Sequence, residues 1–137
     1  MLVYGTANPV GVDEEDYNGV YLTAEDINSM TLDMMGVPVK IEHKGDNVGK
    51  VVSAWQHQGR MDLMLELDES SLSGMFGKEF VMRGMCKDLS LGYNVQMSRN
   101  TDGKLRAFNK KVVEVSLVKK GARAVSYTHL TLPTTPY

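Results

Sequence analysis

The sequence predicts a mainly β protein of the α+β class, with a mixed or antiparallel, barrel-like sheet flanked by two or more helices. Three observations favour this class: many short segments alternate polar and apolar residues, few segments have helical periodicity, and no strand–helix–strand unit repeats. The chain has 137 residues, 42% hydrophobic and 23% charged, which is typical of a single globular domain. A chain of this length buries roughly two-thirds of its unfolded surface, so it needs no disulfide or metal for stability.

Six segments have the alternation typical of strands, and residues that favour turns separate them. Gly59 suits a hairpin between the two middle strands, and a second hairpin is expected at 99–104, where the sequence reads RNTDGK. Residues 11–19 are expected to form a polar, turn-rich connection, and residues 20–22 a short extended piece. The expected strands lie at 1–7, 37–43, 87–98 and 111–120, with two more within 48–68.

Two segments have the periodicity of helices. The first covers 23–36, where Thr23 and Asp26 have the spacing of a capping box and the last residue is a glycine that favours a helix end. The second covers 69–85 and ends near Gly84. The apolar side chains expected to face the core are Ile27, Met30 and Met34 in the first helix and Leu72, Met75, Phe76, Phe80 and Met82 in the second.

Composition and charge argue against several classes of function. The net charge is −2, and acidic and basic residues are interspersed without a basic stripe, so no nucleic-acid partner is expected. No apolar stretch has the length of a membrane span, and the N-terminus lacks the features of a signal peptide, so we expect an intracellular protein without a membrane partner. Cys86 is the single cysteine, which excludes an internal disulfide and fits a reducing compartment.

The chain divides into residues 1–124, which are expected to form one domain, and residues 125–137, whose composition differs. The second segment, VSYTHLTLPTTPY, has four threonines and no charged or titratable side chain apart from His129 and its tyrosines. Residues 125–134 read as the translation of the end of a transposon-derived sequencing adaptor. We therefore interpret 125–137 as a non-native tail, expect the natural chain to be longer, and assign His129 no functional role.

The strand at 87–98, KDLSLGYNVQMS, carries small residues where β-branched residues would pair better. Leu89 and Leu91 share its apolar face, whereas Ser90 and Gly92 lie on its polar face. One interpretation is a half-solvated strand whose outer face tolerates small residues because nothing packs against it. The other is a serine kept exposed on a rigid element so that it can react as a nucleophile.

A nucleophilic serine needs a base that takes its proton and an acceptor that orients the base. His43 ends an apolar strand beside a glycine-bearing turn, which suits a base, but its spacing also fits an ordinary, partly buried histidine. Glu114 interrupts a run of valines, so it either serves as the acceptor or pairs with Lys111 at the surface. His57, in a polar turn, is interpreted as a solvated loop residue.

Three motifs follow one another along the chain: EH at the end of a strand, DLSLGY in a strand after a helix, and EVSLVKKGAR in the last strand. Together they resemble the capsid-maturation (prohead) proteases of tailed bacteriophages, which are related to the herpesvirus assemblins. The most specific feature is the pairing of Ser-x-Gly-aromatic with Glu-Val-Ser-Leu-Val at short separation. The resemblance covers roughly residues 1–124.

The resemblance implies a role for each of these residues. Ser90 matches the nucleophile and His43 the general base, while Glu114 takes the place of a third member that is histidine in the herpesvirus branch. In that branch a Gly-Arg-Arg turn follows and supplies the oxyanion hole. The similar turn here reads GAR, so the backbone N–H of Ala122 and the side chain of Arg123 are the implied donors.

The resemblance also implies substrates and partners. The substrates are the internal scaffold, extensions of the capsid protein and the protease itself, cut inside the assembling viral prohead in the host cytoplasm. The reaction is peptide hydrolysis through an acyl-enzyme on the serine. Many copies are packed in the prohead, so self-association is expected. No metal or organic cofactor is implied.

The alternation along one strand opposes a contact between the candidate base and the candidate nucleophile. His43 shares the register of Val39 and Ile41, which is the core face, whereas Ser90 lies on the polar face of its own strand. The two side chains can meet only if the register breaks at His43, by a bulge or because the strand has already ended.

A non-catalytic function also fits the same fold. A capsid-assembly or scaffolding module would keep the sheet and the helices without the chemistry. This hypothesis expects Ser90, His43 and Glu114 to lie apart, and it expects Ser90→Ala to leave assembly intact.

Two further enzyme classes have weaker support. A metal-dependent hydrolase would use both histidines of the domain together with Asp46 or Asp62. His43 and His57, however, do not lie at ligand spacing on one element. A cysteine nucleophile at Cys86 has no basic partner at motif spacing, and the role of a small buried hydrophobic residue suits it better.

Overall fold

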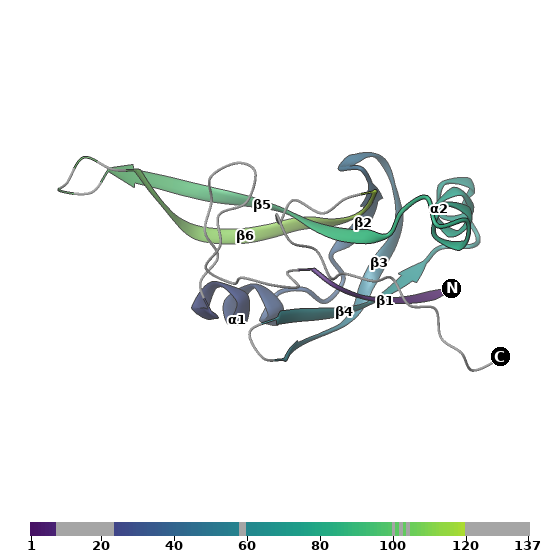
Figure 1. The fold of residues 1–137 in the computed structure, drawn as a ribbon, viewed down its shortest axis with the longest axis horizontal. Coiled ribbons are helices and arrows are strands. Elements are labelled where there is room, and N and C mark those ends of the chain that lie inside the picture. Colours follow the sequence, from purple (N-terminus) through teal and green to yellow (C-terminus); the bar gives the residue numbers. More distant parts are fainter. Residues whose placement is uncertain (8–23, 58–59, 100, 102, 104, 120–137) are drawn as a thin grey trace.

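The computed structural model describes residues 1–7, 24–57, 60–99, 101, 103 and 105–119. Strands dominate these residues and two helices accompany them (Figure 1), so the predicted mainly β, α+β class is confirmed. The elements are β1 (Leu2–Thr6), α1 (Ala24–Leu32), β2 (Pro38–Ile41), β3 (Lys44–His57), β4 (Arg60–Leu67), α2 (Leu72–Met82), β5 (Asp88–Arg99) and β6 (Leu105–Val118).

The strands form one six-stranded sheet in the order β1-β4-β3-β2-β6-β5. Neighbouring strands are antiparallel except β2 and β6, which are parallel, so the sheet is mixed. The edge strands β1 and β5 come into contact, which shows that the sheet curls toward a barrel. Beyond the other strands, β5 and β6 continue as a long two-stranded ribbon (Figure 1).

The core lies inside the curl of the sheet. On β4 every second side chain from Met61 to Leu67 is at most 1% exposed, which is the alternation that the sequence predicts. Helix α1 packs against β3, β4 and β6. It buries the apolar stripe that its periodicity predicts, consisting of Ile27, Met30 and the following Met34.

Helix α2 does not bury the side chains that its periodicity predicts. Leu72, Met75, Phe76 and Met82 are between 52% and 70% exposed, so the prediction that they face the core is wrong for these four. Phe80 is partly buried against the core, as expected. The side of α2 that faces the sheet consists instead of small residues, and its buried positions are Gly74, Gly77 and Val81.

The physical reason is the close approach of α2 to the rest of the chain. A Cβ atom added at Gly77 would lie 3.2 Å from the Cβ atom of Val48 on β3, and one added at Gly74 would lie 1.7 Å from the carbonyl oxygen of Asp68. The hydroxyl of the N-cap residue Ser71 accepts a hydrogen bond from the Gly74 N–H at 3.0 Å and fixes the start of the helix. Because the helix packs through glycines, its large apolar side chains point outward.

Several strand ends meet beside α2. β5 begins next to the end of β6, since Asp88 pairs with Val118, and β2 ends at the same level, since Ile41 pairs with Leu117. Figure 1 shows α2 at this end of the sheet, opposite the projecting ribbon of β5 and β6. The residues that the motifs single out are therefore brought to one end of the molecule.

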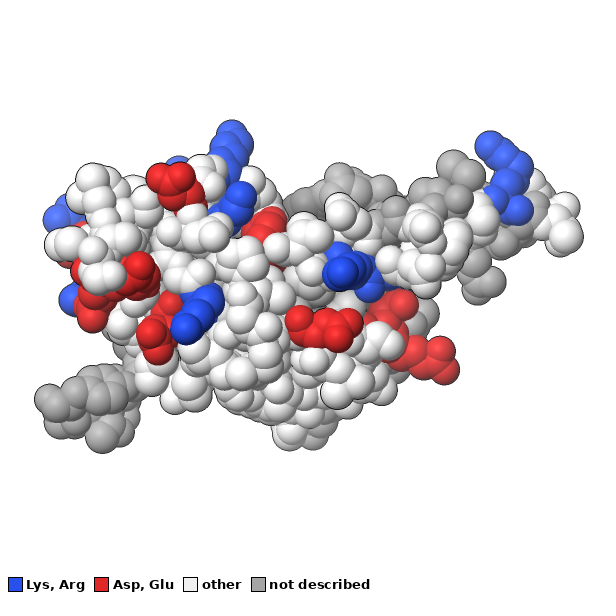
Figure 2. Space-filling view, turned by 180° about the vertical axis from the view of Figure 1, so that it is seen from behind, with Lys and Arg blue, Asp and Glu red and all other residues white. Residues whose placement is uncertain are grey.

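The surface carries charges of both signs. Figure 2 shows acidic and basic side chains scattered among uncharged ones over one face of the molecule. Among the described residues, neither helix has the length and apolar character that crossing a membrane requires.

Candidate active site

The candidate site is built on β5 and β6, beside the end of β2. Ser90 on β5 pairs directly with Ser116 on β6, and Gly92 pairs with Glu114. Paired residues point to the same face of a sheet, so the side chains of Ser90, Ser116 and Glu114 share one face. The opposite face carries buried core side chains such as Val115, which is 0% exposed.

Ser90 is more enclosed than the sequence suggests. It is 5% exposed, and its neighbour Leu89 on the other face is 1% exposed, so this end of β5 is covered on both sides. The expectation of an exposed serine on a half-solvated strand is therefore wrong. The physical reason is that the His43 ring lies against the serine hydroxyl and that Ser90 pairs with the buried Ser116 on β6.

His43 lies in a tight turn and not in a strand, contrary to the expected strand 37–43. β2 ends at Ile41, which pairs with Lys44 at the start of β3, so Glu42 and His43 form a two-residue turn. Both have positive φ angles, 50° for Glu42 and 61° for His43, as a type I′ hairpin turn requires. The register therefore breaks before His43, and its side chain no longer follows the core face of β2.

Hydrogen bonds hold this turn against its backbone strain. A left-handed conformation costs a residue other than glycine about 1–2 kcal/mol. The Glu42 N–H donates to the carbonyl oxygen of Leu117 at 3.0 Å, and the His43 N–H donates to Ser116 Oγ at 2.9 Å. The Glu42 carboxylate accepts a hydrogen bond from the Lys119 N–H at 2.8 Å. The turn is thus fastened at two points to β6 and at a third to Lys119, the residue that follows it.

The three candidate residues form one hydrogen-bonded chain. His43 Nε2 lies 3.0 Å from Ser90 Oγ, and His43 Nδ1 contacts Glu114 Oε1. An ionised carboxylate only accepts hydrogen bonds, so Nδ1 carries the proton and Nε2 is left with its lone pair toward the serine. This tautomer allows Nε2 to take the Ser90 proton. The hypothesis of a non-catalytic module expects these residues to lie apart, and the structure instead brings them together.

The His43 ring is more exposed than the carboxylate that orients it. The Glu114 side chain is 11% exposed and the His43 side chain 42% exposed. Glu114 does not form the surface pair with Lys111 that the sequence left open, because its carboxylate is directed to His43 and to Ser116. The enclosed carboxylate fixes the ring from behind, and solvent or a substrate reaches the ring from its open side.

Ser116 is a member of the site that the sequence analysis missed. It is 0% exposed, donates to Glu114 Oε2 at 2.7 Å, and accepts the hydrogen bond from the His43 N–H. It therefore fixes both the acid and the backbone of the base. The signal was present in the sequence, because Ser116 stands two residues after Glu114 and so lies on the same face of one strand.

The Glu114 side chain explains why the second small residue of the DLSLGY strand is a glycine, Gly92. A Cβ atom at this position would lie 2.0 Å from Glu114 Oε1 and 2.6 Å from the Glu114 carboxyl carbon. The carboxylate therefore lies directly over the backbone of β5 on its way to His43. Only glycine leaves that space, so the residue is required by the side chain opposite it on β6.

Some predicted residues lie outside the described part of the chain. They include the two implied oxyanion-hole donors, Ala122 and Arg123, and the segment 125–137 that is interpreted as a non-native tail. The expected connection at 11–19 and the short extended piece at 20–22 also lie outside it.

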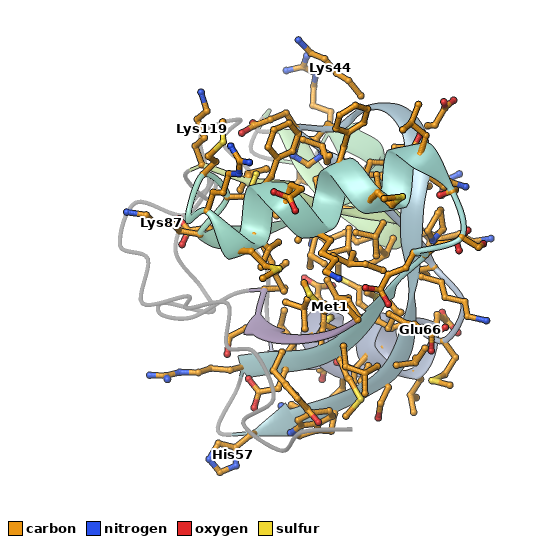
Figure 3. All side chains as sticks on the ribbon, turned by 90° about the vertical axis from the view of Figure 1, so that its right-hand side faces the viewer. Met1, Lys44, His57, Glu66, Lys87 and Lys119 are labelled. Carbon is orange, nitrogen blue, oxygen red and sulfur yellow. The ribbon has the colours of Figure 1, made fainter. Side chains whose placement is uncertain are left out.

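The residues of the metal-hydrolase hypothesis do not come together. His57 ends β3, whereas His43 immediately precedes the first residue of that strand, Lys44. Figure 3 shows His57 and Lys44 at opposite ends of the molecule. Asp62 accepts a hydrogen bond from Thr6 Oγ1 at 2.7 Å, and the described residues contain no cluster of three or more metal-ligating side chains.

Cys86 lies in the connection between α2 and β5 and is 4% exposed. Burial, with a smaller contribution from the Glu42 carboxylate, raises the pKa of its thiol. At neutral pH less of this thiol is ionised than in a free cysteine, and the thiolate is the nucleophilic form. The side chain fits the buried hydrophobic role that the sequence predicts.

Comparisons with known proteins identify the fold. No protein-family model and no curated protein sequence matches the chain. Among solved structures, a protease of Kaposi's sarcoma-associated herpesvirus in complex with a hexapeptide phosphonate inhibitor is similar, with a TM-score of 0.60 and 14% identity. The match covers 96% of this chain and 65% of that chain.

Two further structures of the same viral protease, each with an allosteric inhibitor, are also similar. One has a TM-score of 0.54 and 13% identity and covers 97% of this chain and 79% of the other. The second has a TM-score of 0.52 and 14% identity and covers 96% and 78%, respectively. At this level of identity the similarity establishes the fold, which is that of a herpesvirus protease.

Proposed function

We propose that this chain is a serine endopeptidase in which Ser90 is the nucleophile, His43 the general base and Glu114 the residue that orients the base. The observation that carries the proposal is the continuous hydrogen-bonded chain from Ser90 Oγ through both nitrogens of His43 to the Glu114 carboxylate. The similarity of the fold to a viral protease agrees with it.

The geometry suits a two-step hydrolysis. Ser90 Oγ attacks the carbonyl carbon of the scissile peptide while His43 Nε2 takes the hydroxyl proton. The tetrahedral intermediate collapses as His43 gives this proton to the departing amine, which leaves an acyl group on Ser90. Water then attacks the acyl carbon and loses a proton to His43, which returns the proton to Ser90 Oγ as the carboxylic acid product leaves. Glu114 stabilises the imidazolium that forms in each step.

The finer proposal is a capsid-maturation protease of the tailed-phage type. The ordered EH, DLSLGY and EVSLVKKGAR motifs support it. The substrates would be scaffold and capsid proteins and the protease itself, cut inside the assembling prohead in the host cytoplasm, with copies that self-associate. Ala122 and Arg123 would supply the oxyanion hole in this proposal. No cofactor enters the reaction.

Cleavage of a peptide library tests the proposed activity directly. The purified chain is incubated with a library of synthetic decapeptides with randomised positions, and the products are identified by mass spectrometry. We expect cleavage at a restricted set of sequences, with no requirement for added metal and no effect of a chelator. Products that do not exceed those of a sample containing Ser90→Ala would contradict the proposal.

Glu114→Gln is expected to slow cleavage without abolishing it. The amide oxygen of glutamine can still accept the hydrogen bond from His43 Nδ1, but a neutral amide stabilises the imidazolium less than a carboxylate does. We expect kcat to fall about 10- to 100-fold, which is less than for loss of the nucleophile. The matched control is Glu66→Gln on β4, which contributes nothing to the site. A wild-type rate in Glu114→Gln would mean that the carboxylate does not orient the base.

A further inference from the structure

Glu42 has a backbone conformation that its residue type does not favour. Its φ angle is 50°, and the described residues include only two other non-glycine residues with a positive φ, His43 and Asn109. Asparagine, aspartate or glycine usually begins a type I′ turn, because these residues tolerate the left-handed region. The proposed chemistry requires the imidazole of His43, but it does not require a glutamate at position 42. A residue held in an unfavourable conformation calls for a reason of its own.

The Glu42 side chain supplies this reason. Its Oε1 atom accepts a hydrogen bond from the Lys119 N–H at 2.8 Å. Lys119 follows directly after β6, so its N–H lies beyond the last strand pair, Val118 with Asp88. The side chain of an asparagine is one methylene shorter and, from the same backbone position, ends short of this N–H. The residue type at position 42 therefore matches the length of the gap, although it does not match the turn.

The end of β6 lies between the candidate base and the candidate nucleophile. β6 pairs with β2 on one side and with β5 on the other (Figure 1). On the β5 side, Ser90 pairs with Ser116. On the β2 side, the N–H and the carboxylate of Glu42 contact Leu117 and Lys119, respectively. The distance between base and nucleophile therefore depends on how firmly the turn is attached to this strand end.

The His43 ring depends on the turn for its position. Its side chain is 42% exposed, so packing holds it weakly on its open side. The ring nitrogen Nε2 lies 3.0 Å from Ser90 Oγ, which is a hydrogen-bond distance. Proton transfer requires this distance, and a displacement of about 1 Å can lower the rate about 100-fold. A small shift of the turn would therefore slow the chemical step.

We infer that Glu42 is a positioning residue, whose carboxylate fastens the turn that carries the base to the residue after β6 and so keeps His43 Nε2 within reach of Ser90. The inference rests on the proposed function and adds a residue outside the proposed triad. Glu42 affects the rate of the chemical step through His43, and it takes no part in the proton transfer itself.

Two amide variants separate the reach of the side chain from its charge. Glu42→Asn and Glu42→Gln both remove the charge, and they differ by one methylene. The glutamine can still accept the hydrogen bond from the Lys119 N–H, whereas the asparagine is the better residue for the turn. Asn109→Gln is the matched control, because Asn109 also has a φ of 50° but donates its side-chain hydrogen bond to Gln96, on the opposite strand of the β5–β6 pair.

Glu42→Asn is expected to lower kcat for the best library peptide about 10-fold with little change in KM, while its Tm is at least that of Glu42→Gln. Glu42→Gln and Asn109→Gln should keep kcat within about threefold of the wild type. A role in the fold alone predicts the reverse order, because asparagine suits this turn. The inference is overturned if Glu42→Asn cleaves at the wild-type rate, if either of the other two variants loses as much activity, or if kcat falls only together with Tm.

Labelling with a small fluorophosphonate shows whether Glu42 acts through the base. The phosphorus bonds to the Ser90 oxygen, fluoride leaves and His43 takes the hydroxyl proton. Glu42→Asn should slow this labelling about as much as it slows cleavage. Added to His43→Ala, the same change should alter the labelling rate by less than about twofold, since no base is left to position. Additive losses in the double variant would contradict a role through His43.

The same labelling distinguishes failure of this inference from failure of the proposed function. If the wild type neither cleaves peptides nor reacts at Ser90, the proposed function fails and the role of Glu42 fails with it. If the wild type reacts at Ser90 and Glu42→Asn reacts equally fast, the proposed function stands and only the role of Glu42 is refuted.

Discussion

Ser90→Ala is expected to abolish peptide cleavage, lowering kcat by about 10⁴-fold or more, because among the described residues Ser90 carries the hydroxyl that contacts His43 Nε2. The thermal stability should change little. Ser90 contributes one hydroxyl, and the His43 ring that faces it is 42% exposed, so water can replace the lost hydrogen bond. Cleavage is measured with the best peptide from the library, and unfolding by circular dichroism.

Ser98→Ala is the matched control for this prediction. Ser98 lies on the same strand and at the same alternation as Ser90, but it pairs with Arg106 on the projecting ribbon and is exposed. The Ser98→Ala variant should cleave the peptide at the wild-type rate. A second variant, His43→Ala, should lose about as much activity as Ser90→Ala, and the double variant should lose no more than either, because the two residues act as a unit. Cleavage by Ser90→Ala at the wild-type rate would refute the assignment of the nucleophile.

Gly92→Ala is expected to lower kcat about 100- to 1000-fold, although the residue makes no contact with a substrate in the proposed mechanism. The added methyl group would occupy the space of the Glu114 carboxylate, 2.0 Å from Oε1. The carboxylate must move, and it then loses its contacts with His43 Nδ1 and with Ser116. The effect exceeds that of Glu114→Gln because the amide can stay in place, whereas the displaced carboxylate cannot orient the ring.

A double-mutant cycle shows whether Gly92→Ala acts through Glu114. If the methyl group only displaces the carboxylate, adding Gly92→Ala to Glu114→Ala should change the rate by less than about threefold, since nothing is left to displace. Fully additive losses would mean that the methyl group disturbs β5 itself, including Ser90 two residues away. Circular dichroism of Gly92→Ala checks that the fold is retained.

Much of the sheet, including the strands that carry Ser90 and Glu114, could be predicted because the signals are local. Alternation along β4 directly reports which side chains are buried, and the stripe of α1 correctly gives Ile27 and Met30 as core. The motifs that carry Ser90 and Glu114 also lie on strands, where the period of two determines the face.

Other features depended on distant parts of the chain. The orientation of α2 follows from the glycines that pack on Val48 and Asp68, and a periodicity of apolar residues does not reveal which side of a helix can approach a sheet most closely. The position of the β2–β3 turn was also missed, because Glu42 and His43 are not the asparagine–glycine type of residues that usually mark such turns.

The strained turn connects the fold to the proposed chemistry. Two left-handed residues other than glycine are unfavourable, and three hydrogen bonds to β6 and the segment after it compensate. This arrangement takes the His43 ring out of the register of β2 and directs it across β6 to Ser90 on β5. Ser116 stabilises both the turn and the carboxylate, because its hydroxyl accepts a hydrogen bond from the His43 N–H and donates one to Glu114.

Covalent labelling shows most directly whether Ser90 is a nucleophile that His43 activates. The full chain is incubated with a small fluorophosphonate, and the site and rate of modification are determined by intact-mass measurement and peptide mapping. We expect one adduct, on Ser90, that is absent from Ser90→Ala and forms at least about 100-fold more slowly in His43→Ala. An adduct on another serine, or labelling of Ser90 no faster than labelling of the exposed Ser98, would contradict it.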